Sequence, residues 1–371
     1  MPSGFPHILT PDELTARRHA HVTDFLAGRG LDPGRLSALM RERVGEGRLL
    51  LTSSPVHGLA NPTSDLDFIR IQRDAIDGPR ISTKIFDEGH HLEVVSFSEA
   101  ELASNLDELT RLAGLPAERT VAGFRAWDKQ REPRRKQTER IVNGIAMDGT
   151  APYLAWLPAL STVWSRAALH TAVEQVVHTA LAEAAGETRG RVGYAYNVLL
   201  HLMDALLSHH GDVYTTRKWY VLRWTRLMAE GGWHDARLQS VASGLEVLRK
   251  GVSAHLDPAA AHEPLAGTYA ELVADAVRAT GTAATVTVAV ELAGEPQPFL
   301  PGASVLLGAG AGSGVVLPGV GTGADLPFTT GAVGLDAPAA LDAPAAASLL
   351  RALRAGAATL RIGYVTGEDG R

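Results

Sequence analysis

The stretch from Leu51 to Phe68 reads LTSSPVHGLANPTSDLDF, and the fold prediction starts from it. Residues Arg48–Thr52, with three leucines at their centre, predict a short buried strand. Residues Ser53–Ser64 contain prolines, a glycine and an asparagine, so they predict a turn-rich loop. Asp65–Gln72 begins with alternating polar and apolar residues, as a strand does. The stretch therefore predicts two strands joined by a loop of mostly small residues.

Two aspartates, Asp65 and Asp67, open the second strand. Side chains two positions apart on a strand point to the same face, so these carboxylates should project together. Adjacent unpaired carboxylates repel each other, and a cation relieves that repulsion. Mg²⁺ prefers carboxylate and phosphate oxygens and binds through one or two carboxylates plus the phosphates of a substrate. The pair therefore predicts a magnesium–triphosphate site, and the bland alternative is a turn or a solvated edge strand.

A third acid, Glu93, stands between apolar residues in the predicted strand His91–Phe97. Burying an unpaired glutamate is costly, so the position implies a partner or a metal ion. If this strand lies beside the one with the two aspartates, Glu93 can face the same metal ions. The alternative is a salt bridge from Glu93 to Arg70 or Lys84.

The loop before the aspartates is a candidate phosphate contact. Ser53 and Ser54 directly follow a strand, where a turn can direct backbone N–H groups and a hydroxyl toward phosphate oxygens. Gly58 would let the backbone approach a phosphate or take a positive φ. His57 could touch a substrate, although a loop histidine is more often exposed.

Further elements are predicted around this stretch. Pro11 to about Gly28 and Pro33 to Val44 have helical patterns. Arg80–Phe86 and His91–Phe97 predict strands joined by a hairpin turn at Asp87–His90.

The middle of the chain is predicted to be helical. Ser98 and Glu101 have the spacing of a capping box, which marks a helix start. From about Thr110 to Thr280, apolar residues recur at helical spacing and all six tryptophans occur, which favours a bundle.

The last part of the chain is mixed. Residues 284–291 and 359–365 predict strands, and residues 345–357 predict a helix. The run Gly308–Gly314 fits no phosphate-loop motif, because no lysine follows it, and is interpreted as a flexible connection.

Composition narrows the function classes. The 371 residues carry a formal net charge of −6 and no long basic run, so long nucleic acid is a poor partner. The densest basic stretch, Arg131–Arg140, is interpreted as a solvated helix face. The absence of cysteine excludes disulfides, thiolate nucleophiles and cysteine-ligated zinc. Without a signal pattern or a long apolar run, the sequence predicts a soluble cytoplasmic protein with no membrane partner.

The run from Leu51 to Asp67 resembles the signature of the DNA polymerase β-like nucleotidyltransferase superfamily. That signature is a small-residue turn, a loop, an Asp-x-Asp or Asp-x-Glu motif on the next strand, and a third acid on a later strand. Ser54 matches the serine of the turn, and Gly58 matches the second glycine common in the minimal and aminoglycoside-modifying members. Ser53 departs from the family, which usually has glycine there.

A second resemblance covers Tyr194 to Trp224, which is similar to the helical domain of kanamycin nucleotidyltransferase-like proteins. In these relatives a Lys-Trp pair near this place starts a helix, and the lysine can reach the triphosphate. The resemblance makes Lys218 a candidate phosphate ligand, with Arg217 as its substitute. The alternative for Lys218 is an exposed lysine at a helix start.

Together these features predict an α+β protein of three domains. Residues 1–110 would form a nucleotidyltransferase catalytic domain with a small mixed sheet and flanking helices. Residues 111–282 would form a helical domain, and residues 283–371 a small mixed α/β domain whose role the sequence leaves open.

The resemblance implies Mg²⁺-dependent transfer of a nucleoside monophosphate, AMP above all, from an NTP to a small-molecule acceptor with release of pyrophosphate. One Mg²⁺ would be held by Asp65 and Asp67, and a second would be shared with Glu93. The partners implied are the NTP and the small acceptor. Glu174 and Asp204 are helix-borne candidates for a general base, although both have the character of surface acids. The sequence leaves the NTP, the acceptor and the oligomeric state open.

Two alternatives remain from the sequence. The acceptor could be a tRNA end or a protein side chain, as in some toxin–antitoxin relatives. The chain could also be a non-catalytic module that binds a nucleotide or a partner. The near-neutral charge favours a small acceptor, and retention of Asp65, Asp67 and Glu93 argues against a non-catalytic module.

Overall fold

The structure is a computed structural model that describes residues 5–76, 82–87, 89–127, 134–231, 233, 235–251, 265–294, 297–300, 303–307, 314–318, 333–335 and 337–366. They form a mixed α+β protein. By its internal contacts the chain divides into two compact units, Met1–Ser165 with Leu207–Gly232 and Arg166–Leu206 with Trp233–Arg371. We call these the first unit and the second unit. The three-domain division has other bounds and stays a prediction.

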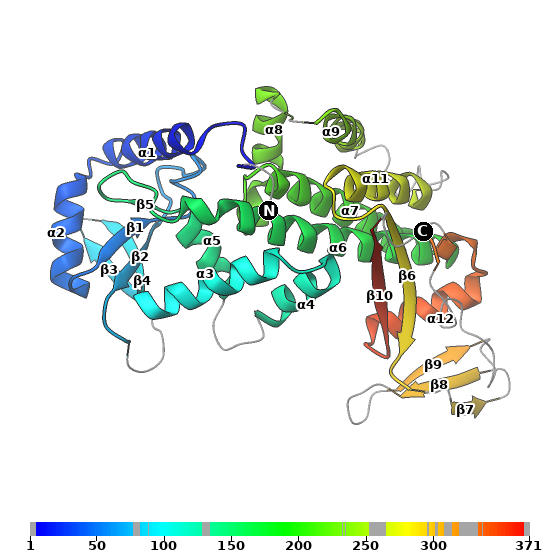
Figure 1. The fold of residues 1–371 in the computed structure, drawn as a ribbon. Helices are drawn as coiled ribbons and strands as arrows, with labels where there is room; N and C mark the ends of the chain where they lie inside the picture. Colours follow the sequence, from blue (N-terminus) through cyan, green and yellow to red (C-terminus); the bar gives the residue numbers. More distant parts are fainter. Residues whose placement is uncertain are drawn as a thin grey trace. The chain divides into compact units, whose positions relative to one another are not determined.

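A small mixed sheet forms the centre of the first unit (Figure 1). Its strands are β1 (Arg48–Leu51), β2 (Leu66–Gln72), β3 (Ser82–Asp87), β4 (His90–Ser98) and β5 (Ile145–Ala146). They lie in the order β3-β4-β2-β1-β5. β2 and β4 are parallel, and the other neighbouring pairs are antiparallel.

The predicted strands before Ser98 are confirmed. β1, β2 and β4 begin and end within one residue of the predicted bounds. β3 is described from Ser82 to Asp87, and Arg80 and Ile81 of the predicted strand lie outside the described residues. The hairpin between β3 and β4 is also confirmed, since Asp87 pairs with His90 and Gly89 has a φ of 83°.

Helices cover both faces of this sheet (Figure 1). On one face, an apolar cluster joins Leu26 and Met40 to strand residues such as Phe68. On the other face, a helix packs against β2 and β4. The α-helices that lie within the first unit are α1 (Pro11–Ala27), α2 (Pro33–Val44), α3 (Glu99–Ala113), α4 (Ala117–Trp127), α5 (Arg134–Asn143) and α8 (Tyr220–Glu230). Of these helices, α1 and α2 contribute to the apolar cluster on the first face, and α3 packs against β2 and β4 on the other face.

Local sequence signals set the starts of these helices. Ser98 and Glu101 form the predicted capping box of α3, in which each side chain accepts from the other residue's backbone N–H. Thr10 and Glu13 form a second capping box at α1. Asp32 caps α2, whose first residue is a proline. The predicted helices α1 and α2 are therefore confirmed.

The second unit combines helices with two small antiparallel sheets. The unit boundaries fall inside α6 (Leu157–Ala184) and α7 (Thr188–His209). The other elements of this unit are α9 (Ala236–Lys250), α11 (Ala266–Ala279), β6 (Thr285–Leu292), β7 (Gln297–Leu300), β8 (Ala303–Leu307), β9 (Gly314–Pro318), α12 (Ala343–Arg354) and β10 (Ala358–Val365). β6 pairs with β10, and β8 pairs with both β7 and β9.

The helical prediction for the middle of the chain is confirmed over the described residues, and so are the predicted elements at β6, α12 and β10. The run Gly308–Gly314, interpreted as a connection, lies outside the described residues except for Gly314. Within the described part of the chain, no helix is both long enough and apolar enough to span a bilayer.

Candidate functional site

A polar row crosses the sheet of the first unit. Asp67 on β2 and Glu93 on β4 are direct neighbours in the parallel ladder. Across the other edge of β2, the Thr52 N–H donates to the Asp67 carbonyl at 2.9 Å. Neighbouring residues in register share a face of the sheet, so Thr52, Asp67 and Glu93 form one row. The expectation that the strand of Glu93 lies beside that of Asp67 is confirmed.

Asp65 lies at the exposed end of the same face. It directly precedes β2, and its carboxylate is 3.1 Å from Nδ1 of His91. The Phe86 ring stacks on the His91 ring with the centroids 4.9 Å apart. Since His91 is two residues before Glu93 on β4, Asp65 and Asp67 project to one side of the sheet. The Asp65 side chain is 59% exposed, in contrast to 17% for Asp67.

Asp67 and Glu93, the two less exposed acids, each contact another side chain of the protein. Nη2 of Arg140, on α5, is 3.1 Å from Oδ2 of Asp67. The Ser82 hydroxyl donates to Oε1 of Glu93 at 2.7 Å. The alternative of a Glu93 salt bridge to Arg70 gains no support, because Arg70 donates to Ser96 instead.

These acids fit Mg²⁺ in donor chemistry and in register, since carboxylates from adjacent strands face one side. Their side chains are nevertheless directed to Arg140, Ser82 and His91. Among the described residues, no three acidic or histidine side chains come together as a group that could hold a metal ion. A bound Mg²⁺ would therefore require Asp67 to exchange Arg140 for the metal.

The turn that follows β1 is strained. Ser53 has a φ of 66°, and among the described residues it is the one non-glycine residue with a positive φ. For an L-residue this conformation costs roughly 1–2 kcal/mol. Ser53 therefore keeps the backbone shape that glycine adopts at little cost, at the position where the resembled family has glycine. Ser53 and Ser54 are both buried, and the Ser53 hydroxyl has no hydrogen-bond partner among the described residues.

Gly58 takes the positive φ that the sequence analysis allowed, at 60°. A Cβ at this position would lie 2.9 Å from the ring of His21, so the glycine permits close packing on that ring. Its carbonyl accepts from Nη2 of Arg226 at 2.7 Å. A phosphate contact at Gly58 stays a prediction.

The remaining candidate site residues are distant in sequence from the row of acids. Lys218 is exposed in the short 3₁₀ helix Arg217–Trp219, with Nζ 5.1 Å from the centroid of the Trp219 ring. Its role as a phosphate ligand stays a prediction. Glu174 and Asp204 belong to the second unit, on α6 and α7.

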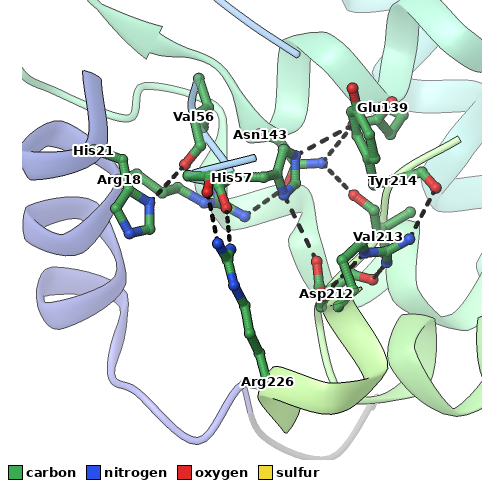
Figure 2. Close-up of polar contacts among 12 residues, drawn as sticks. Arg18, His21, Val56, His57, Glu139, Asn143, Asp212, Val213, Tyr214 and Arg226 are labelled. Atoms are coloured by element: carbon green, nitrogen blue, oxygen red, sulfur yellow. Dashed lines mark hydrogen bonds and ion pairs between the residues drawn. The ribbon is translucent and has the colours of Figure 1, made fainter. Parts of the chain in front are cut away.

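Figure 2 shows a buried polar cluster that was not predicted from the sequence. Glu139, which precedes Arg140 on α5, is 1% exposed. Its carboxylate accepts from Asn143 at 2.9 Å and from the Thr215 hydroxyl at 2.6 Å. The interpretation of Arg131–Arg140 as a solvated face is wrong at this position, because α5 turns Glu139 and its neighbours inward.

His57 is also part of this cluster, and the expectation of an exposed loop histidine is wrong. Its side chain is 7% exposed, with Nε2 3.8 Å from Glu139 and Nδ1 3.6 Å from Asp212. The Tyr214 ring lies against it, with the ring centroids 4.7 Å apart. An imidazole between two carboxylates holds the loop that follows Ser53 and Ser54 in place.

The surroundings in this cluster lower the pKa values of its two acids, Glu139 and Asp212. Burial raises the pKa of Glu139, but His57, Thr215 and Asn143 together bring that pKa below its usual value. Burial likewise opposes ionisation of Asp212, yet the Arg223 guanidinium at 3.1 Å holds the Asp212 pKa well below its usual range. Both carboxylates are therefore charged at neutral pH.

The pKa of Tyr214 is raised, in contrast to those of the two acids. Burial, with help from the charge of Glu139, raises the pKa of Tyr214 to about 12. Glu139 and Arg140 are consecutive, so α5 connects this cluster directly to Asp67.

Comparison with known proteins places the chain in a family. No curated protein matches it. Residues 9–364, nearly the whole chain, match the family of unknown function DUF6001. The chain therefore belongs to the DUF6001 family.

Proposed function

We propose that the first unit transfers a nucleoside monophosphate, with AMP the expected one, from an NTP to a small-molecule acceptor. The observation that carries the proposal is the row Thr52–Asp67–Glu93. It supports the proposal because it brings acids from two strands together one residue away from the Ser53 turn. Holding a metal-bound triphosphate requires carboxylates for the metal and N–H groups for the phosphates, side by side.

In this proposal the acids would bind the metal ion, and the turn at Ser53 would bind the phosphates. Asp67 and Glu93 would hold Mg²⁺, with Asp65 joining from the exposed end of the face. When bound, Mg²⁺ neutralises charge on the triphosphate and lowers the pKa of the acceptor hydroxyl. The turn at Ser53 and Ser54 would orient the phosphates for in-line attack. The acceptor oxygen would bond to the α-phosphorus as the bond to pyrophosphate breaks.

Arg140 must leave Asp67 before that carboxylate can bind a metal ion. Its guanidinium neutralises Asp67, and both side chains are mostly buried, at 12% and 17% exposed. A guanidinium binds phosphate as well as carboxylate. We therefore expect Arg140 to move from Asp67 to the triphosphate when the metal-bound NTP enters.

The same contact favours a second candidate function, a module that binds a nucleotide without catalysis. In that case Arg140 stays on Asp67 and supplies the positive charge that the metal would bring. The lack of a preformed metal-binding group among the described residues is consistent with this alternative.

One experiment separates these functions. The protein is incubated with Mg²⁺, each NTP in turn and a pool of metabolites, while pyrophosphate is measured and small molecules are searched by mass spectrometry for a nucleotide adduct. Asp67→Asn and Glu93→Gln should lower pyrophosphate release at least about 100-fold. Asp74→Asn, an exposed acid just beyond β2, is the matched control and should leave it unchanged.

The outcomes have distinct meanings. NTP binding that is independent of Mg²⁺, with no pyrophosphate, would support the non-catalytic module. Pyrophosphate release with an adduct on tRNA or protein would identify a macromolecular acceptor. If no NTP binds under any condition, both candidate functions are wrong.

A further inference from the structure

A basic cavity of about 70 Å³ lies within the first unit, and its lining does not include Thr52, Asp67 or Glu93. Its walls come from α1, the loop after β1, residues 210–212 and α8. Four arginines and two acids line it, which gives a formal charge of +2 with the histidines neutral. These six residues are Arg17, Arg18, Arg223, Arg226, Asp212 and Glu230.

Arg18 brings an unused donor to this cavity. It is 4% exposed and makes no ion pair with a described residue. Its Nη2 donates to Asn143 at 2.7 Å, while its buried Nη1 has no hydrogen-bond partner in the part of the chain that the structure describes. Burial lowers the pKa of Arg18 to about 10, although the charges of Asp212 and Glu139 oppose this shift, so the side chain still carries its charge at neutral pH. A buried charge with an unused donor is costly, which favours the binding of an anion beside it.

Arg226 adds a second positive charge without a carboxylate partner among the described residues. Its guanidinium donates to the carbonyls of His57 at 3.0 Å and of Gly58 at 2.7 Å. By contrast, Arg17 pairs with Glu230 and Arg223 pairs with Asp212. Figure 2 shows Arg226 reaching from its helix toward the loop, while Arg18 comes from α1. The excess charge of the cavity is thus that of Arg18 and Arg226.

We propose that this cavity binds a small tetrahedral oxyanion, a phosphate group. A phosphate dianion would balance the +2 formal charge, and the planar fork of arginine matches phosphate oxygens. The volume of about 70 Å³ exceeds the roughly 10–15 Å³ that a cavity needs to hold one water molecule. It is far below the roughly 300–1,000 Å³ of pockets for drug-sized ligands. The size of the cavity therefore favours a small anion such as a phosphate group.

The anion would also fix the loop that carries the Ser53 turn. Arg226 already holds the carbonyls of His57 and Gly58, which follow Ser54 closely along the chain. Neutralising Arg226 and Arg18 would stabilise this arrangement. The inference does not depend on nucleotidyl transfer, and its test uses neither NTP nor Mg²⁺.

The test is titration calorimetry of the full chain with inorganic phosphate, against chloride at equal ionic strength. We expect one phosphate per chain. Arg226→Met should weaken binding at least about tenfold, because one charge-assisted contact is lost. Arg43→Gln removes an exposed arginine of α2 that does not line the cavity, so it should bind phosphate like the unchanged chain.

Arg18→Lys provides a second variant that keeps the positive charge in the cavity and removes the fork. It should also bind phosphate about tenfold more weakly, while tryptophan fluorescence reports an unchanged fold. Glycerol phosphate distinguishes the sources of the anion. Equal binding points to a phosphomonoester, and binding of inorganic phosphate alone points to the free ion. Absence of binding at millimolar phosphate, or equal affinity in all variants, would overturn the proposal.

Discussion

Replacing Glu139 by glutamine tests the buried cluster beside the row of acids. The side chain is 1% exposed and accepts hydrogen bonds from Asn143 and Thr215. Glutamine keeps the size of the side chain but loses the charge, and it can offer only one oxygen to these two donors. A hydrogen bond to a charged group contributes about 1.5–3 kcal/mol, so the variant should be less stable by about 2 kcal/mol at neutral pH.

The effect should depend on pH. The pKa of Glu139 in the folded chain lies below its ordinary value, so protons bind the unfolded chain more readily. The stabilisation is thus fully present above about pH 4.3 and is lost as the pH falls through the lower pKa of the folded state. The difference between the two proteins should therefore shrink below about pH 4.3.

Urea denaturation followed by tryptophan fluorescence measures this free energy. Five of the six tryptophans belong to the first unit, so the signal reports mainly on it. A loss of about 2 kcal/mol corresponds to roughly 4–8 °C in Tm for a unit of this size. Glu42→Gln, at a side chain 71% exposed on α2, is the control and should change stability by less than about 0.5 kcal/mol. Equal stability of the two variants at neutral pH would refute the assignment of Glu139 as a buried, charged centre.

Three further predictions concern the backbone and a histidine. Gly58→Ala should cost more stability than Gly30→Ala. Both glycines have a φ of 60° or more, but a Cβ at Gly58 would collide with His21, whereas a Cβ at Gly30 would meet nothing within 4 Å. Similar losses of stability in thermal denaturation would contradict this packing. Ser53→Gly should stabilise the chain by up to about 1 kcal/mol by relieving the positive φ, and a loss of stability would show that the serine side chain outweighs the strain. Burial lowers the pKa of His7 to about 4, so the native state should lose stability as the pH falls from about 6.5 to 4, and His7→Asn should flatten that slope in pH-dependent denaturation. An unchanged slope in the variant would mean that other groups cause it.

Local sequence signals predicted much of the first unit. The capping box of Ser98 and Glu101 acts within one helical turn, so its outcome does not depend on the rest of the chain. The alternation around Asp67 and Glu93 likewise defined β2 and β4. Their parallel pairing could be posed only as a condition, because register between distant strands depends on tertiary packing.

The buried cluster could not be read in the same way. Glu139 lies in a stretch dense with arginine and lysine, where charge patterning favours a solvated face. The available signal was its i, i+4 spacing to Asn143 on either side of the apolar pair Ile141 and Val142, which is weak alone. Its partners Thr215 and His57 are distant in sequence, so only the fold brings them together. The ion pair of Arg140 with Asp67 was missed for the same reason.

The proposed transfer requires Asp67 and Glu93 to hold an Mg²⁺-bound NTP. Its most direct test is pyrophosphate release with Mg²⁺ and a single NTP in the presence of the acceptor pool, comparing the unchanged chain with Asp67→Asn and the Asp74→Asn control. We expect pyrophosphate release from the unchanged chain and from the control, and at least about a 100-fold loss in Asp67→Asn. Equal release from Asp67→Asn and the control, or none from the unchanged chain with any NTP, would contradict it.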